Sequence, residues 1–156
     1  MGLGVAAVGW ALSPAKLTLF VWHKSLGVLI LGVVALRLLW RLAHRPPALP
    51  AGMPEWERRA AAASHFLLYA LLVALPLSGW VIASASGIPF RVFWQWPLPE
   101  LVAPDKAVAD AAARIHFALL VVFGPLLAVH VAAALRHHYV KHDDVLRRML
   151  PFGDSR

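Results

Sequence analysis

The sequence predicts an all-α integral membrane protein, a four-helix bundle in which the first helix is truncated. Hydrophobic residues make up 60% of the 156 residues, charged residues only 15%, and the mean hydropathy is +0.67. Three apolar stretches are each long enough to cross a hydrocarbon core of about 30 Å as a helix. We therefore expect a single membrane domain over residues 1–156. Its expected helices are about 1–12 (partial), 17–42, 60–84 and 108–138.

The opening segment, residues 1–12, is apolar but has about half the length that a membrane span requires. No Lys or Arg precedes it and no small-residue cleavage site follows it, so a signal peptide is not indicated. We interpret the segment as the distal part of a first helix whose beginning is absent. The turn signal Ser13-Pro14 ends it.

The second expected helix, residues 17–42, carries polar residues at a helical spacing. His23, Arg37 and His44 follow one another at intervals of 14 and 7 residues, which places them on one face. Gly27 lies one turn after His23 on the same side. Its missing side chain suits either the close approach of a flat macrocycle or the packing of another helix.

The third expected helix, residues 60–84, has no formal charge between Arg59 and Arg91 and carries His65 in its first turns. A proline-rich loop precedes it, and residues 86–110 are expected to be loop-like. The aromatic residues of this second loop suit the headgroup interface or, alternatively, a stacked path for electrons or a substrate. They are Phe90, Phe93, Trp94 and Trp96.

The last expected helix contains the 21 uncharged residues 115–135, yet it carries His116 and His130. These two histidines are 14 residues apart, so they leave one face at depths separated by roughly 21 Å. Polar side chains in apolar spans are costly and suggest function. His137 and His138 follow just beyond the span, as an interfacial cluster or as part of a site.

Basic residues predict the orientation. The segments 37–59 and 136–156 hold ten of the fifteen Lys and Arg residues, so their side is expected to be cytoplasmic. This reading places the C-terminus in the cytoplasm, and it explains the net charge of +7 by membrane topology better than by nucleic-acid binding. His23 and His116 are then expected near the outer surface, and Arg37 and His130 near the inner one.

Histidines at matching depths on neighbouring helices suit b-type haem, because two imidazoles can bind one iron from opposite sides. With no cysteine in the chain, thiolate sites and iron–sulfur clusters are excluded. Bis-imidazole ligation favours electron transfer over oxygen binding. The cations near the two histidine depths either offset the charges of haem propionates or extend from the helix ends to the membrane interface. They are Lys24, Arg114 and Arg37.

Three blocks of sequence resemble the bacterial cytochrome b561 family of small di-haem membrane proteins: LSPAKLTLFVWHKSLGVLILG, SHFLLYALLVALPLSGW and RIHFALLVVFGPLLAVHVAAALRHH. The resemblance implies four helices, two b haems and a location in the bacterial inner membrane. By motif, His23 and His116 would hold the outer haem and His130 the inner one. The family's other inner ligand, a histidine early in the first helix, has no match here. Three explanations of the missing ligand are open: a start codon assigned too far downstream, a five-coordinate inner haem, or replacement of the ligand by His65.

The family includes enzymes that oxidise superoxide at the outer surface and reduce ubiquinone. An outer rim of five cations would attract a small anion, although it is also an ordinary solvated surface. The cations are Lys16, Lys24, Arg91, Lys106 and Arg114. His65, His137 and His138 are candidates for a quinone or proton site. Two other classes stay open: an anchor or electron-relay subunit of a dehydrogenase or hydrogenase, and a transporter or proton pathway without haem.

Overall fold

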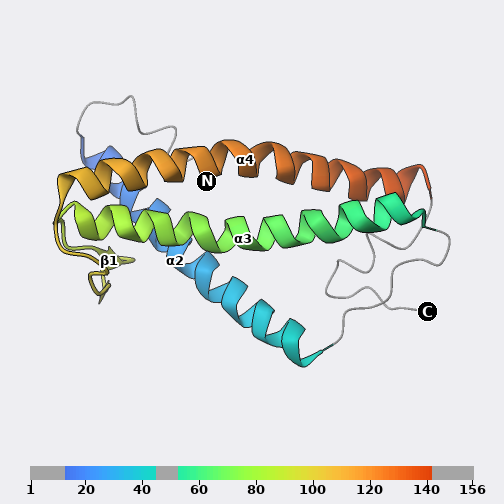
Figure 1. The fold of residues 1–156 in the computed structure, drawn as a ribbon. Coiled ribbons are helices and arrows are strands. Elements are labelled where there is room, and N and C mark those ends of the chain that lie inside the picture. The colour runs from blue at the N-terminus through green and yellow to red at the C-terminus, as the bar shows by residue number, and fades with distance from the viewer. Residues whose placement is uncertain (1–12, 45–52, 142–156) are drawn as a thin grey trace.

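Three long helices dominate the computed structural model, which describes residues 13–44 and 53–141. They are α2 (Pro14–Ala43), α3 (Glu55–Ala85) and α4 (Lys106–Tyr139). A two-stranded antiparallel hairpin, β1 (Arg91–Val92) and β2 (Trp96–Pro97), lies between α3 and α4. Figure 1 shows α3 and α4 side by side, with α2 crossing them obliquely. Apart from the connecting segment 86–105, which contains the hairpin, the described part of the chain is mainly helical, as predicted.

Each helix begins and ends beyond the predicted apolar span, because capping residues and charged turns extend it. The Ser13 hydroxyl accepts a hydrogen bond from the Lys16 amide at 3.3 Å at the start of α2. The Asp105 carboxylate accepts hydrogen bonds from Ala107 and Val108 at 2.7 and 3.1 Å, so α4 begins at Lys106. The prediction of a loop as far as residue 110 was therefore wrong. Hydropathy reports depth in the membrane, whereas caps determine where a helix begins.

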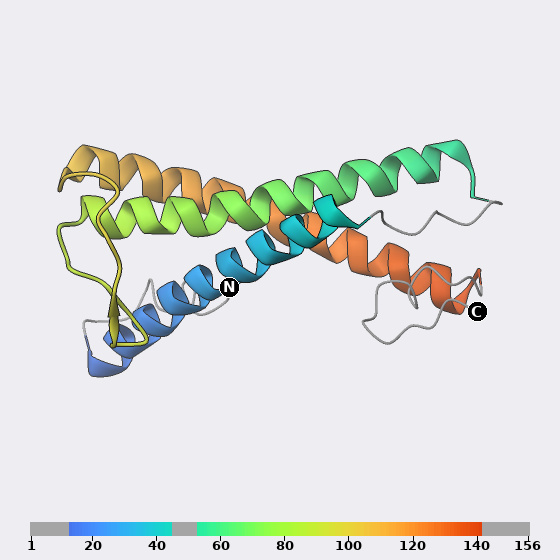
Figure 2. The same ribbon diagram turned by 90° about the horizontal axis from the view of Figure 1, so that it is seen from below.

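The helices form a pair and a crossing partner. α3 and α4 run antiparallel, and their shared core is built from Leu68, Leu71, Leu75 and Phe123. α2 starts at the same end as α4 and packs against α3 and the hairpin. It crosses the pair obliquely: its N-terminal end lies apart from α3 and α4 in Figure 2, and its C-terminal end lies apart from them in Figure 1. We call the end with Ser13, Ala85 and the hairpin the hairpin end, and the opposite end, with Ala43 and Tyr139, the far end. These correspond to the predicted outer and inner ends.

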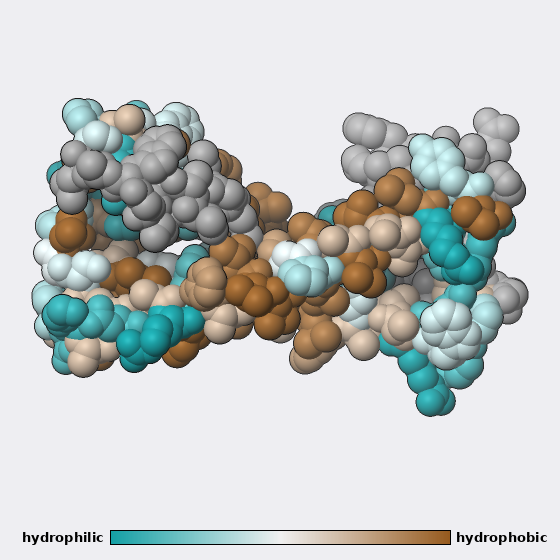
Figure 3. Space-filling model, turned by 90° about the horizontal axis from the view of Figure 1, so that it is seen from above, coloured by the Kyte–Doolittle hydropathy of each residue, from teal (hydrophilic) through white to brown (hydrophobic). Residues whose placement is uncertain are grey.

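Many large apolar side chains of the described helices are exposed. Leu36, Phe66 and Val129 are 68%, 73% and 68% exposed, which water would penalise but a lipid bilayer would not. Figure 3 shows hydrophobic surface in the middle of the molecule and hydrophilic surface toward its two ends. All three described helices are long and apolar enough to cross a membrane. This arrangement is that of a membrane protein.

The hairpin folds over the beginning of α2. Phe93 and Trp94 have left-handed backbone angles, with φ of 48° and 64°, which cost non-glycine residues about 1–3 kcal/mol. Two contacts offset this cost. The Phe93 amide donates to the buried Ser25 hydroxyl at 2.8 Å, and the Trp22 ring meets Phe93 and Trp94 edge to face.

The predicted first helix, residues 1–12, lies outside the described residues, as do residues 45–52 and 142–156. The three other predicted spans are confirmed as helices. A bundle of four helices stays a prediction.

Candidate haem site

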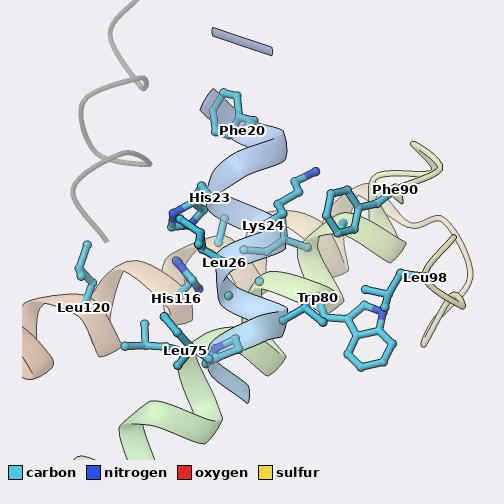
Figure 4. Close-up of a pocket in the computed structure, with 18 of the residues that line it drawn as sticks. Phe20, His23, Lys24, Leu26, Leu75, Trp80, Phe90, Leu98, His116 and Leu120 are labelled. Atoms are coloured by element: carbon cyan, nitrogen blue, oxygen red, sulfur yellow. The ribbon is translucent and has the colours of Figure 1, made fainter. Parts of the chain in front are cut away.

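Two histidines face one another between α2 and α4 near the hairpin end. The ring centroids of His23 and His116 are 6.2 Å apart and their planes are inclined by 83°. Figure 4 shows both rings projecting into the same space. With metal–nitrogen bonds of about 2 Å, two imidazoles on opposite sides of one metal ion have their centres roughly 6 Å apart. The separation of the two rings therefore matches that of two imidazoles on one iron.

The rings of these histidines line a cavity of about 600 Å³. This volume lies in the range of sites for small molecules and cofactors, about 300–1,000 Å³. Apolar side chains form most of the wall, as the porphyrin of a b haem requires. They come from α2 (Phe20, Leu26, Val28, Ile30), from α3 (Leu75, Pro76, Trp80, Ile82, Ala83), from the connecting loop (Phe90, Leu98) and from α4 (Ala113, Phe117, Leu120).

Two glycines lie in the wall of the cavity, Gly27 on α2 and Gly79 on α3. A Cβ atom built at Gly27 would have no atom of the described residues within 4 Å, so this position faces open space. A Cβ at Gly79 would lie 3.5 Å from Cε1 of His116, so the imidazole rests closely against the backbone of α3. Of the two interpretations of Gly27, the structure therefore favours the close approach of a flat ligand over helix packing against the described elements.

The predicted cationic contacts of this site differ in position. Lys24 lines the cavity, and its ammonium group lies 5.3 Å from the centroid of the Phe90 ring. Arg114 is exposed and is not among the residues that line the cavity. Arg37 lies further toward the far end, where its Nε donates to the Tyr69 hydroxyl at 2.9 Å. Only Lys24 is thus placed at this cavity.

The third predicted ligand, His130, lies in the half of the helix pair toward the far end. Its Nδ1 is 3.1 Å from the Ser64 hydroxyl, and its ring centroid is 5.2 Å from that of His65. This separation is shorter than the roughly 6 Å expected for two imidazoles on one iron. The first-helix histidine that the family resemblance implies has no match in this sequence, because residues 1–12 contain no histidine.

His137 and His138 lie at the far end in separate surroundings. His137 Nε2 is 3.8 Å from the Glu57 carboxylate, which also pairs with Arg136 and, more closely, with Lys141. Glu57 is only 9% exposed, so this cluster connects the beginning of α3 to the end of α4. The His138 ring instead lies 4.8 Å from that of Tyr139. The structure thus does not bring His65, His137 and His138 into one contact group.

Sequence reasoning missed several polar partners of the candidate residues. Ser78 and Ser64 contact His116 and His130, Tyr69 contacts Arg37, and Glu57 contacts His137. A signal for the serines was present in the sequence: Ser64 and Ser78 are 14 residues apart, the same interval that separates His116 from His130.

Comparison with known proteins agrees with this geometry. The family model of prokaryotic cytochrome b561 matches residues 1–152. The chain is 41% identical over 134 residues to cytochrome b561 homolog 2 of Escherichia coli K12, covering 85% of this chain and 71% of that protein. It is 30% identical over 129 residues to cytochrome b561 homolog 1 of the same organism (83% and 73% covered). It is 32% identical over 130 residues to the probable superoxide oxidase CybB of Yersinia pestis (83% and 73% covered).

Proteins of the matched family are membrane cytochromes that bind haem b and transfer electrons. The chain has an apolar cavity lined by two facing histidines and three described helices long and apolar enough to cross a membrane. The chain belongs to the prokaryotic cytochrome b561 family.

Proposed function

We propose that this protein binds haem b between His23 and His116 and transfers electrons from superoxide to ubiquinone across the bacterial inner membrane. The observation that carries the cofactor site is the pair of facing imidazoles, 6.2 Å apart, on the wall of an apolar cavity. One-electron oxidation and reduction of iron is the chemistry that a bound haem b supplies. His23 and His116 would hold the iron from both sides, and Lys24 would offset a propionate.

The superoxide step is supported by similarity and by charge. One relative carries the name probable superoxide oxidase at 32% identity. At the hairpin end, five cations stand against three acidic residues, so this surface has a formal charge of +2 and attracts a small anion. The cations are Lys16, Lys24, Arg91, Lys106 and Arg114, and the acidic residues are Glu100, Asp105 and Asp110.

The balanced reaction needs two electrons and two protons for each ubiquinone. Two superoxide ions each lose one electron and become dioxygen, and ubiquinone becomes ubiquinol. We place quinone reduction toward the far end, which carries the basic segments and would face the cytoplasm together with the C-terminus. There His65 is the candidate closest to His130, and His137 and His138 are candidate proton donors at the helix end.

The purified holoprotein should reduce ubiquinone when superoxide is supplied, and the rate should fall as salt is added. Exposed charges are screened over about 8 Å at physiological ionic strength, which weakens the attraction of the anion to the cationic rim. Stopped-flow absorbance at several salt concentrations measures this rate. A rate independent of salt would remove the steering role of the rim. Activity with a dehydrogenase or hydrogenase partner, and none with superoxide, would instead identify a relay subunit.

A second haem at His130 is also part of the proposal, and counting haem per chain tests its ligands. His130→Ala should lower the haem content, because it removes an iron ligand. His65→Ala should leave the haem content unchanged, because the His65 ring lies closer to His130 than two imidazoles on one iron would. Equal loss of haem in the two variants would make His65 the opposing ligand.

A further inference from the structure

Two serines of α3 lie against the two candidate histidines of α4. The Ser78 hydroxyl is 2.9 Å from Nδ1 of His116, and the Ser64 hydroxyl is 3.1 Å from Nδ1 of His130. Because the helices are antiparallel and both intervals are 14 residues, the same contact recurs at two depths. In each pair the serine meets Nδ1 and not Nε2.

The direction of the hydrogen bond to His116 follows from a second contact. The Ser78 hydroxyl donates its proton to the Leu75 carbonyl at 2.9 Å. A serine hydroxyl has a single proton, so toward His116 it acts as an acceptor, and Nδ1 of the imidazole must donate. A neutral imidazole with its proton on Nδ1 has a free electron pair on Nε2. His116 is thereby prepared to bind a metal through Nε2.

The surroundings hold this arrangement in place. Leu75 is 1% exposed and belongs to the core between α3 and α4, so its carbonyl lies on a well-packed turn. At Gly79, the residue after Ser78, a Cβ atom would lie 3.5 Å from Cε1 of His116, an ordinary van der Waals contact, so the imidazole lies directly beside the backbone of α3. The chain from Leu75 through Ser78 to His116 therefore connects a rigid helix turn to the candidate ligand.

We propose that Ser78 is a positioning residue for His116: it selects the tautomer that binds iron through Nε2 and sets the reduction potential of the haem at the hairpin end. The inference rests on the proposed ligation by His116. A hydrogen-bond acceptor on the outer nitrogen raises the basicity of a ligating imidazole. A more basic ligand stabilises the ferric state, so Ser78 would lower the potential of this haem.

Redox titration of the purified holoprotein, followed by its optical spectrum, tests the proposal. Ser78→Ala should raise the midpoint potential of the haem at the hairpin end, identified as the haem that His116→Ala removes. Ser78→Thr keeps the hydroxyl and should keep the potential of the unaltered protein. Ser64→Ala, a matched change on the same helix, should leave the haem at the hairpin end unaffected.

An unchanged potential in Ser78→Ala, or the same shift in Ser78→Thr as in Ser78→Ala, would overturn the role of the hydroxyl. If Ser78→Ala loses this haem altogether, retention by Ser78→Thr supports the proposal, and loss in both variants refutes it. Retention of the normal low-spin signal by His116→Ala would refute the proposed ligation itself. An error in the proposed ligation by His116 and an error in the proposed role of Ser78 therefore give different experimental results.

Discussion

His23→Ala and His116→Ala should each abolish the low-spin signal of the haem at the hairpin end. Each variant removes one of the two imidazoles that face one another across the cavity at 6.2 Å. A six-coordinate low-spin iron needs both axial ligands, so loss of either one is expected to eliminate the sharp absorption bands of that site. Optical spectra of the oxidised and reduced protein, with haem counted per chain, measure the effect.

His44→Ala is a matched control for these variants. His44 is exposed at the end of α2, where its ring stacks on Trp40 at 3.8 Å and does not line the cavity. Its replacement should leave the spectrum unchanged. A normal signal in both His23→Ala and His116→Ala would show that the facing histidines are not the ligands.

Gly27→Leu should weaken haem binding at the hairpin end without disrupting the helices. Position 27 lines the cavity, and a Cβ there would enter open space, so the larger side chain would occupy volume that the macrocycle needs. Overpacking typically costs about 1–3 kcal/mol, so haem affinity should fall roughly 5- to 150-fold. Titration of the apoprotein with haem, followed by absorbance, gives this ratio.

Gly32→Leu provides the comparison on the same helix. A Cβ at Gly32 also meets no atom of the described residues within 4 Å, but Gly32 does not line the cavity. It should retain the haem affinity of the unaltered protein, and circular dichroism should show equal helix content in the two variants. If Gly27→Leu bound haem as tightly as Gly32→Leu, Gly27 would not be adjacent to the macrocycle.

The sequence by itself determined the membrane class, the three described spans and the depth of the candidate ligands. Apolar length reports whether a helix can cross a bilayer, and a fixed rise per residue converts the spacing of His116 and His130 into two depths. The matching positions of His23 and His116 could be predicted in this way. Their polar neighbours could not, because hydropathy and spacing do not specify which face of one helix meets which face of another.

Only the tertiary structure decided the lateral arrangement of the helices. It placed Lys24 at the cavity and left Arg114 outside it, although the two lie at similar predicted depths. It also placed Ser78 against His116 and His65 beside His130. Helices in a membrane associate through close packing and interhelical hydrogen bonds, with little hydrophobic driving force between them. Such contacts depend on the rotation of each helix about its axis, which the α3–α4 core and the docked hairpin set together.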